Sequence, residues 1–298
     1  TPAPGMIPDD SENSGQQLIV PRLIINATAL NTGHLFQFTG TCVGEPQISS
    51  VSSGTTSMPH LKQLCMDDPA LTVAQRQRLD QITLGEAVAA SCCVPGLLEP
   101  LCLSGLYHDA QGDDIKVRLV DGGVFDNQGL VSLFEEDCTH FVCSDASDLL
   151  QWQSDPEDIF HAVAMRANDI FMDRIRIEVK QRLLQREPGN FAVFNLGATE
   201  GSDSFGDDAA EFLQSLKSIR TDLDAFSDIE AWSLMYHGYM VSAQHLLDGQ
   251  STTADDAGKT SARQWNFTRI QELAENTQER QRILRYLKVG SRQFFKVF

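Results

Sequence analysis

Residues 117–129 read Val117-Arg-Leu-Val-Asp121-Gly122-Gly123-Val-Phe-Asp126-Asn127-Gln-Gly129. The apolar run 117–120 predicts a short strand, and Asp121-Gly122-Gly123 predicts the turn that ends it. Two residues without side chains after a carboxylate also leave room for a neighbouring segment to approach closely. The three residues therefore suit either a plain turn or a general base that touches a nucleophile on another segment.

On both sides of these residues, apolar runs that predict strands alternate with helical patterns. Such alternation favours an α/β layer architecture with a largely parallel sheet. In sheets of this kind, functional groups gather at the carboxyl ends of strands. Asp121 lies at one such end, and Asp145 lies just beyond another. The other expected strands cover residues 18–25, 35–38 (a hairpin partner), 139–143 and 191–196.

The helical patterns concentrate towards the C-terminus. Ser227 with Glu230 forms a capping-box signature, which marks the start of a helix. We expect a flexible tail at 1–16, polar loops at 46–68 and 198–208, an α/β core over about 20–200 and a helical part over about 208–298. The helices are expected at residues 80–90, 158–184, from 227 onwards and from about 261.

The composition is that of a globular protein, with 42% apolar and 21% charged residues among 298. It excludes collagen-like, low-complexity and wholly disordered chains. The net charge of −18 repels phosphate backbones, which argues against nucleic acid as the main partner.

Neither the cysteines nor the histidines show a metal-binding pattern. The seven cysteines include no C-x-x-C pair, and we predict buried thiols in a reducing compartment rather than a disulfide framework. The seven histidines are scattered, and the sequence holds no Walker loop, G-x-G-x-x-G or H-E-x-x-H motif. We therefore expect no metal and no organic cofactor.

Five segments, in order, resemble patatin-like phospholipases. Asp121-Gly122-Gly123 is similar to the D-G-G/A signature of that family. Together the five segments cover about residues 20–245, so the chain is identified as the C-terminal portion of a patatin-like domain. The other four are Pro21 to Gly33, the A-S-x-x-x-P-like segment Leu84 to Gly96, Val142 to Ser147, and Ser233 to Tyr239.

The resemblance implies a three-layer α/β/α fold, incomplete on its N-terminal side, and a Ser–Asp dyad that hydrolyses fatty-acyl esters. Asp121 would be the general base, in a loop supported by Gly122, Gly123 and Asn127. The family's serine lies in G-x-S-x-G, which this sequence lacks together with the glycine-rich oxyanion loop. Both are expected upstream of Thr1, so we predict that this chain alone is inactive.

Other residues near the motif offer the same chemical groups. Ser91, Cys92 and Cys93 precede a Pro-Gly pair, and small residues there favour packing of a helix on the sheet over nucleophilic attack. Asp126 is an alternative carboxylate whose position favours loop hydrogen bonding. Asp145 is interpreted first as a turn or helix-start residue.

The segment 280–298 carries six basic residues and no acidic residue. As a helix it suits either an anionic membrane surface or, as we prefer, docking of its basic face on the acidic body of the protein. We expect a cytoplasmic protein, with peripheral membrane contact through 280–298 as the alternative.

Two functions from different classes fit these observations. The first is part of a phospholipase or lysophospholipase that acts in lipid degradation, with an N-terminal segment or companion chain carrying the serine. The second is an inactive truncated patatin-like module that binds lipid or a protein partner. Because the nucleophile strand of such a sheet is central, we also expect this chain alone to self-associate or to be poorly soluble.

Overall fold

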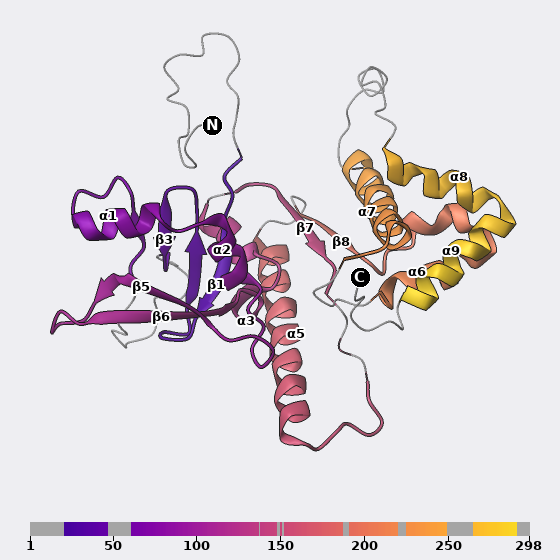
Figure 1. The fold of residues 1–298 in the computed structure, drawn as a ribbon. Helices are drawn as coiled ribbons and strands as arrows, with labels where there is room; N and C mark the ends of the chain where they lie inside the picture. The colour runs from indigo at the N-terminus through magenta and orange to yellow at the C-terminus, as the bar shows by residue number, and fades with distance from the viewer. Residues whose placement is uncertain are drawn as a thin grey trace, which may run out of the picture. The chain divides into compact units, whose positions relative to one another are not determined.

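The computed structural model describes residues 21–46, 61–136, 138–147, 150, 152–186, 191–219, 225–248 and 265–290 (Figure 1). The chain divides into two compact units, Thr1–Thr139 with Leu150–Pro188, and His140–Leu149 with Gly189–Phe298. The tail expected at 1–16 lies outside the described residues. A mixed α/β fold with a helical C-terminal part is confirmed.

The first unit is built on a six-stranded sheet in the order β4-β3-β2-β1-β6-β5. Every neighbouring pair is antiparallel, so the expectation of a largely parallel sheet is wrong here. The physical reason is that short connections, such as the one between β1 and β2, can join only antiparallel strands. The strands are β1 (Ile25–Ala29), β2 (Leu35–Phe38), β3 (Cys42–Gly44), β4 (Leu64–Cys65), β5 (Leu101–His108) and β6 (Asp114–Asp121).

β1 is central, because it pairs with β2 on one side and with β6 on the other. It begins at Ile25, later than the strand expected at 18–25, whose residues before 21 lie outside the described part. The hairpin partner expected at 35–38 is confirmed as β2. On the other side, Ala27 lies opposite Asp121, which places the end of β6 beside the middle of β1.

In the described part of the first unit the helices are α1 to α5. The helix expected at 80–90 is found as α2, which begins at Leu84, whereas α1, which ends at Asp80, was not expected. Thr72 caps α1, and Thr83 caps α2 in a capping box with Glu86, so the chain turns between the two helices. The long helix expected at 158–184 is confirmed as α5. The helices are α1 (Val73–Asp80), α2 (Leu84–Ser91), α3 (Gly123–Asp126), α4 (Leu130–Glu135) and α5 (Phe160–Arg186).

The core of the first unit lies between the sheet and the helices α1 and α2. Strand residues such as Phe36, Leu103 and Leu119 are completely or almost completely buried there, and Leu79 and Ala87 contribute from the helices. Burial of each large apolar side chain stabilises the unit by about 1.5–3 kcal/mol before conformational entropy is counted. This packing holds β1, β6 and α2 together.

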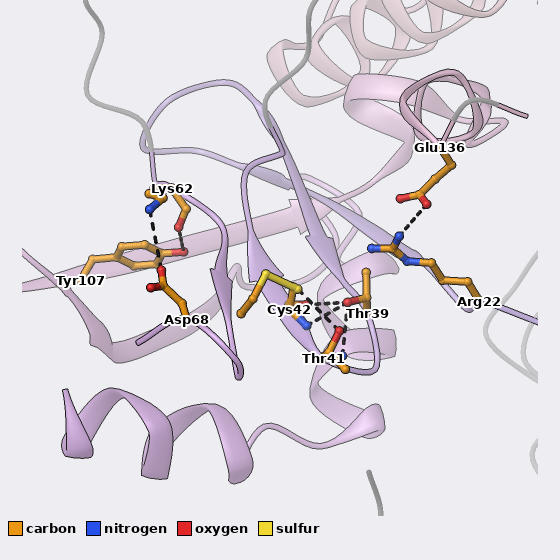
Figure 2. Close-up of a disulfide and its surroundings, with 9 residues drawn as sticks. Arg22, Thr39, Thr41, Cys42, Lys62, Asp68, Tyr107 and Glu136 are labelled. Atoms are coloured by element: carbon orange, nitrogen blue, oxygen red, sulfur yellow. Dashed lines mark hydrogen bonds and ion pairs between the residues drawn. A yellow bond between two sulfur atoms is a disulfide. The ribbon is translucent and has the colours of Figure 1, made fainter. Parts of the chain in front are cut away.

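A disulfide joins Cys42 on β3 to Cys65 on β4, which corrects the prediction that all seven cysteines are thiols (Figure 2). The two residues are direct cross-strand partners, with Cα atoms 4.1 Å apart. The other five cysteines form no disulfide. The sequence does not reveal this pair because 22 residues separate the cysteines, and only the β3–β4 register brings them together.

The second unit holds a parallel pair, β7 (Phe141–Asp145) and β8 (Phe191–Asn195), which confirms both expected strands. The loop expected at 198–208 is instead the 3₁₀ segment η1 (Glu200–Asp208), in which Phe205 is fully buried. The capping box of Ser227 and Glu230 is confirmed at the start of α7. The other elements are α6 (Ala209–Lys217), α7 (Asp228–Asp248), η2 (Asn266–Thr268), α8 (Arg269–Glu275) and α9 (Thr277–Gly290).

The basic helix α9 is docked in the second unit, as we preferred. Its apolar side is buried, with Leu284 and Leu287 among the least exposed residues. Arg280 bonds to Asp208 at 2.7 Å and Lys288 bonds to Glu211 at 2.6 Å. Residues 291–298 lie outside the described part. No helix within the described ranges has both the length and the apolar character needed to cross a membrane.

Candidate active site around Asp121

The candidate site lies where β6 ends and the chain turns into α3. The backbone N–H of Asp121 donates to the carbonyl of Cys93 at 2.9 Å, and that of Gly122 donates to the carbonyl of Ser91 at 3.3 Å. On the side facing β1, the hydroxyl of Thr28 donates to the Asp121 carbonyl at 2.9 Å. The segments 21–33 and 84–96 therefore meet the Asp121-Gly122-Gly123 motif at this turn.

Other atoms lie close to both glycines after Asp121. A Cβ at Gly122 would overlap the carbonyl oxygen of Asn26 and lie 2.9 Å from its carbonyl carbon. A Cβ at Gly123 would lie 2.7 Å from Asn127 Oδ1 and 2.9 Å from Met172 Cε on α5. Real Cβ atoms essentially never come this close to other heavy atoms. At Gly122 the nearest atoms are backbone, so a Cβ there would force β1 or the turn to move, whereas at Gly123 they are side-chain ends, which would have to shift.

The Asp121 carboxylate is half-buried, and one of its oxygens is held. Oδ1 accepts a hydrogen bond from the Gly123 N–H at 2.6 Å. Within the described part of the chain, no hydrogen bond reaches the second oxygen, Oδ2. Burial raises the pKa of Asp121, and the Gly123 hydrogen bond partly opposes that rise. The geometry leaves Oδ2 available to accept a proton.

Asp126 has the loop-stabilising position that its sequence context favoured. It is almost fully buried, and its carboxylate accepts the backbone N–H groups of Val131 at 2.6 Å and Gln128 at 3.3 Å. Burial raises the pKa of Asp126, and these backbone hydrogen bonds oppose the rise. Asn127, expected to support the loop, is exposed, although its Oδ1 lies beside Gly123.

A buried row of polar side chains lies behind the loop, and the sequence alone did not reveal it. Gln37 Nε2 donates to Ser132 Oγ at 2.9 Å, and that hydroxyl donates to Asn26 Oδ1 at 2.9 Å. Gln37 and Ser132 are both nearly inaccessible to solvent. The row links β2, α4 and β1, and so fixes the strand residue against which Gly122 packs.

The side chains of Ser91, Cys92 and Cys93, the alternative nucleophiles, do not bond to the Asp121 carboxylate. The Cys93 thiol lies 3.5 Å from the Glu99 carbonyl, and the Cys92 thiol 3.7 Å from the Ala89 carbonyl. Ser91 contacts the turn through its backbone carbonyl. Among the described residues, no hydroxyl or thiol donates to the Asp121 carboxylate.

The remaining two resembling segments lie in the second unit. Asp145 is buried at the end of β7 and accepts the Ser147 N–H at 3.2 Å, as expected of a turn residue. On α7, Ser233, Tyr236 and His237 are all buried, and His237 Nε2 lies 2.9 Å from the Ala198 carbonyl. These contacts account for the segment as packing within its own unit.

The first unit also holds a second polar cluster that the sequence alone did not predict. Glu45, the residue directly after β3, is buried, and its carboxylate contacts the Thr32 hydroxyl, the His34 ring at 3.3 Å and the Leu61 N–H at 3.1 Å. These contacts tie the β1–β2 turn to the segment before β4. In the ranges the structure covers, no group of three potential metal ligands comes together.

No protein-family model, curated protein or solved structure matches this chain. The patatin-like relationship therefore stays a prediction. The chemistry of the site rests on its own residues.

Proposed function

We propose that this chain is the base-bearing portion of a lipid acyl hydrolase of the phospholipase or lysophospholipase type. The observation that carries the proposal is the state of the Asp121 carboxylate. One oxygen is fixed by the Gly123 N–H, the other accepts no hydrogen bond from the described residues, and burial raises the pKa. Structural carboxylates in the same unit, such as Glu45 and Asp126, instead use both oxygens.

The proposed chemistry needs only a hydroxyl and this carboxylate. A serine hydroxyl attacks the ester carbonyl and gives its proton to Asp121 Oδ2. The protonated carboxyl then returns the proton to the alcohol that leaves, and an acyl-serine remains. Water attacks that acyl-serine with the same carboxylate as base, which releases the fatty acid and restores the serine. An ordinary aspartate has a pKa of about 3.9, so the rise caused by burial makes Asp121 a better base near neutral pH.

The serine and the oxyanion-hole donors would come from residues outside this 298-residue sequence, which contains no G-x-S-x-G. The close packing at Gly122 supports a serine from another segment, because it fixes the turn and leaves Oδ2 of Asp121 unused. The partner would be an N-terminal segment or a companion chain that brings its serine to this turn. The substrate would be a lipid acyl ester.

The alternative is an inactive patatin-like module that binds lipid or a protein partner. One observation favours it, namely that no described hydroxyl or thiol donates to the Asp121 carboxylate. We leave membrane contact through 280–298 out of the main proposal. Leu284 and Leu287 are buried, and Arg280 and Lys288 already pair with acidic side chains.

The test uses a longer polypeptide that adds the G-x-S-x-G segment, and a fluorophosphonate probe that labels activated serines. We expect the parent protein to be labelled and Asp121→Asn to lose labelling. Asp80→Asn, which changes an exposed carboxylate at the end of α1, is the matched control and should label like the parent. Equal labelling of Asp121→Asn would reject Asp121 as the base, and no labelling of the parent would favour the inactive module.

A further inference from the structure

The Cys42–Cys65 disulfide lies at one edge of the six-stranded sheet (Figure 2). β4, which carries Cys65, is the last strand of the sheet on that side and has only two residues. Cys65 is partly exposed, whereas Cys42 is only 9% exposed. The two residues therefore differ in access, and the sulfur of Cys65 is the better target for a thiolate that arrives from solution.

The strands that carry the disulfide are also paired by hydrogen bonds that do not involve sulfur. Next to the disulfide, the Met66 N–H donates to the Thr41 carbonyl at 3.0 Å. At the other end of β3, the Glu45 N–H donates to the Leu61 carbonyl at 2.9 Å. Reduction would therefore leave two thiols on directly opposite residues, whose Cα atoms are 4.1 Å apart. Such a pair can form the same disulfide again without movement of a strand.

Side chains from other elements hold the segment around Cys65 as well. The Tyr107 hydroxyl on β5 donates to the Lys62 carbonyl at 3.0 Å. The Arg76 guanidinium on α1 donates to the Asp68 carbonyl at 2.5 Å. These contacts place the segment without the covalent link, so we expect that the disulfide can open while the unit stays folded.

The other cysteines indicate what kind of disulfide this is. Five of the seven cysteines form no disulfide, and one of these five, Cys102, is exposed. Exposed thiols persist in reducing compartments, where the disulfides that do form are usually transient and either catalytic or redox-sensing. This pattern favours a reversible disulfide over a permanent crosslink.

We propose that Cys42 and Cys65 are a reversible thiol–disulfide couple, a modification site for small thiols of the glutathione class. A thiolate of that class attacks the Cys65 sulfur, the S–S bond breaks, and Cys42 leaves as a thiolate. A second small thiolate attacks the small-thiol sulfur of the mixed disulfide, which releases Cys65. The protein disulfide gains two electrons and two protons, and the two small thiols become one disulfide. The proposal does not depend on the proposed hydrolysis.

The first test measures how fast reduced glutathione opens the disulfide at urea concentrations below the unfolding transition. Alkylation followed by peptide mass spectrometry gives the fraction opened. Exchange in the folded protein predicts a rate that stays constant over this range of urea, and return of the Cys42–Cys65 disulfide when oxidised glutathione is added. A disulfide that stays closed, one that opens only in parallel with the unfolded fraction, or reoxidation to other pairings would overturn the proposal.

The second test identifies the sulfur that is attacked. With oxidised glutathione, Cys42→Ser should gain one glutathione on Cys65, whereas Cys65→Ser should gain none on the buried Cys42, and peptide mapping locates the additions. Cys102→Ser is the matched control, because it removes an exposed cysteine of β5, and its disulfide should open like that of the parent. Equal modification of Cys42 and Cys65, or no modification of Cys65, would refute the assigned attack.

Discussion

Gly122→Ala tests the close approach that shapes the candidate site. The new Cβ would overlap the Asn26 carbonyl oxygen and lie 2.9 Å from the carbonyl carbon. Both atoms are backbone, so no side-chain rotation relieves the contact, and β1 or the turn must move. Overpacking of this kind costs about 3 kcal/mol at its upper end, while the lower entropy of unfolded alanine offsets about 0.4–1 kcal/mol. We expect a net loss of about 2 kcal/mol.

The measurement is urea unfolding followed by circular dichroism, with calorimetry to obtain the melting temperature. A loss of about 2 kcal/mol lowers the melting temperature of a unit of this size by about 4–8 °C. Gly40→Ala is the control, because a Cβ there has no neighbour within 4 Å and no left-handed backbone to strain. It should unfold like the parent or at slightly higher urea. Equal stability of the two variants would refute the close approach of Asn26 to Gly122.

Three further predictions concern the disulfide, the site carboxylate and a helix cap. Reduction of the Cys42–Cys65 disulfide should raise the number of cysteines outside a disulfide from five to seven and lower the free energy of unfolding by about 3 kcal/mol, whereas unchanged stability would contradict the chain-entropy reasoning. Because burial raises the pKa of Asp121, its carboxyl favours folding most below its ordinary pKa of about 3.9 and loses that contribution as the pH rises through the raised pKa. The free energy of unfolding in urea should therefore be larger for Asp121→Asn than for the parent at pH 7, and this difference should become smaller towards pH 4. A difference that grows on acidification would show that the pKa of Asp121 is lowered instead. Ser227→Ala should cost about 1 kcal/mol, because the Ser227 hydroxyl and the Glu230 carboxylate cap α7; no loss in calorimetry would mean that the cap is dispensable.

Strong local signals in the sequence predicted several elements correctly. The periodic apolar residues of α5, the capping box at Ser227 and the turn after β6 each depend on neighbouring residues only. β5 was missed because Gly105, with a positive φ of 76°, interrupts its apolar pattern at an irregularity in the β5–β6 register. The antiparallel pairing was not predicted because the direction of neighbouring strands depends on which strands pair and how long the connections between them are. The alternation of helical and strand patterns along the sequence does not specify either.

The site was predictable only in part for a similar reason. The motif Asp121-Gly122-Gly123 marked the turn and the need for room beside it, and a neighbouring segment does approach there. Which segment approaches was not predictable, because Asn26 precedes Gly122 by 96 positions and only the β1–β6 register joins them. The contact of Glu45 with Thr32 and His34 likewise arises from the folding of two consecutive turns.

The central claim is that Asp121 accepts the serine proton during acyl-ester hydrolysis. The most direct measurement is kcat/KM for a short-chain p-nitrophenyl ester and a phospholipid, using the longer polypeptide that carries the serine segment. General-base catalysis contributes about 10²–10⁴-fold, so Asp121→Asn should lower kcat/KM at least about 100-fold while Asp80→Asn leaves it unchanged. An Asp121→Asn protein that folds normally and keeps the parent's kcat/KM would contradict the account.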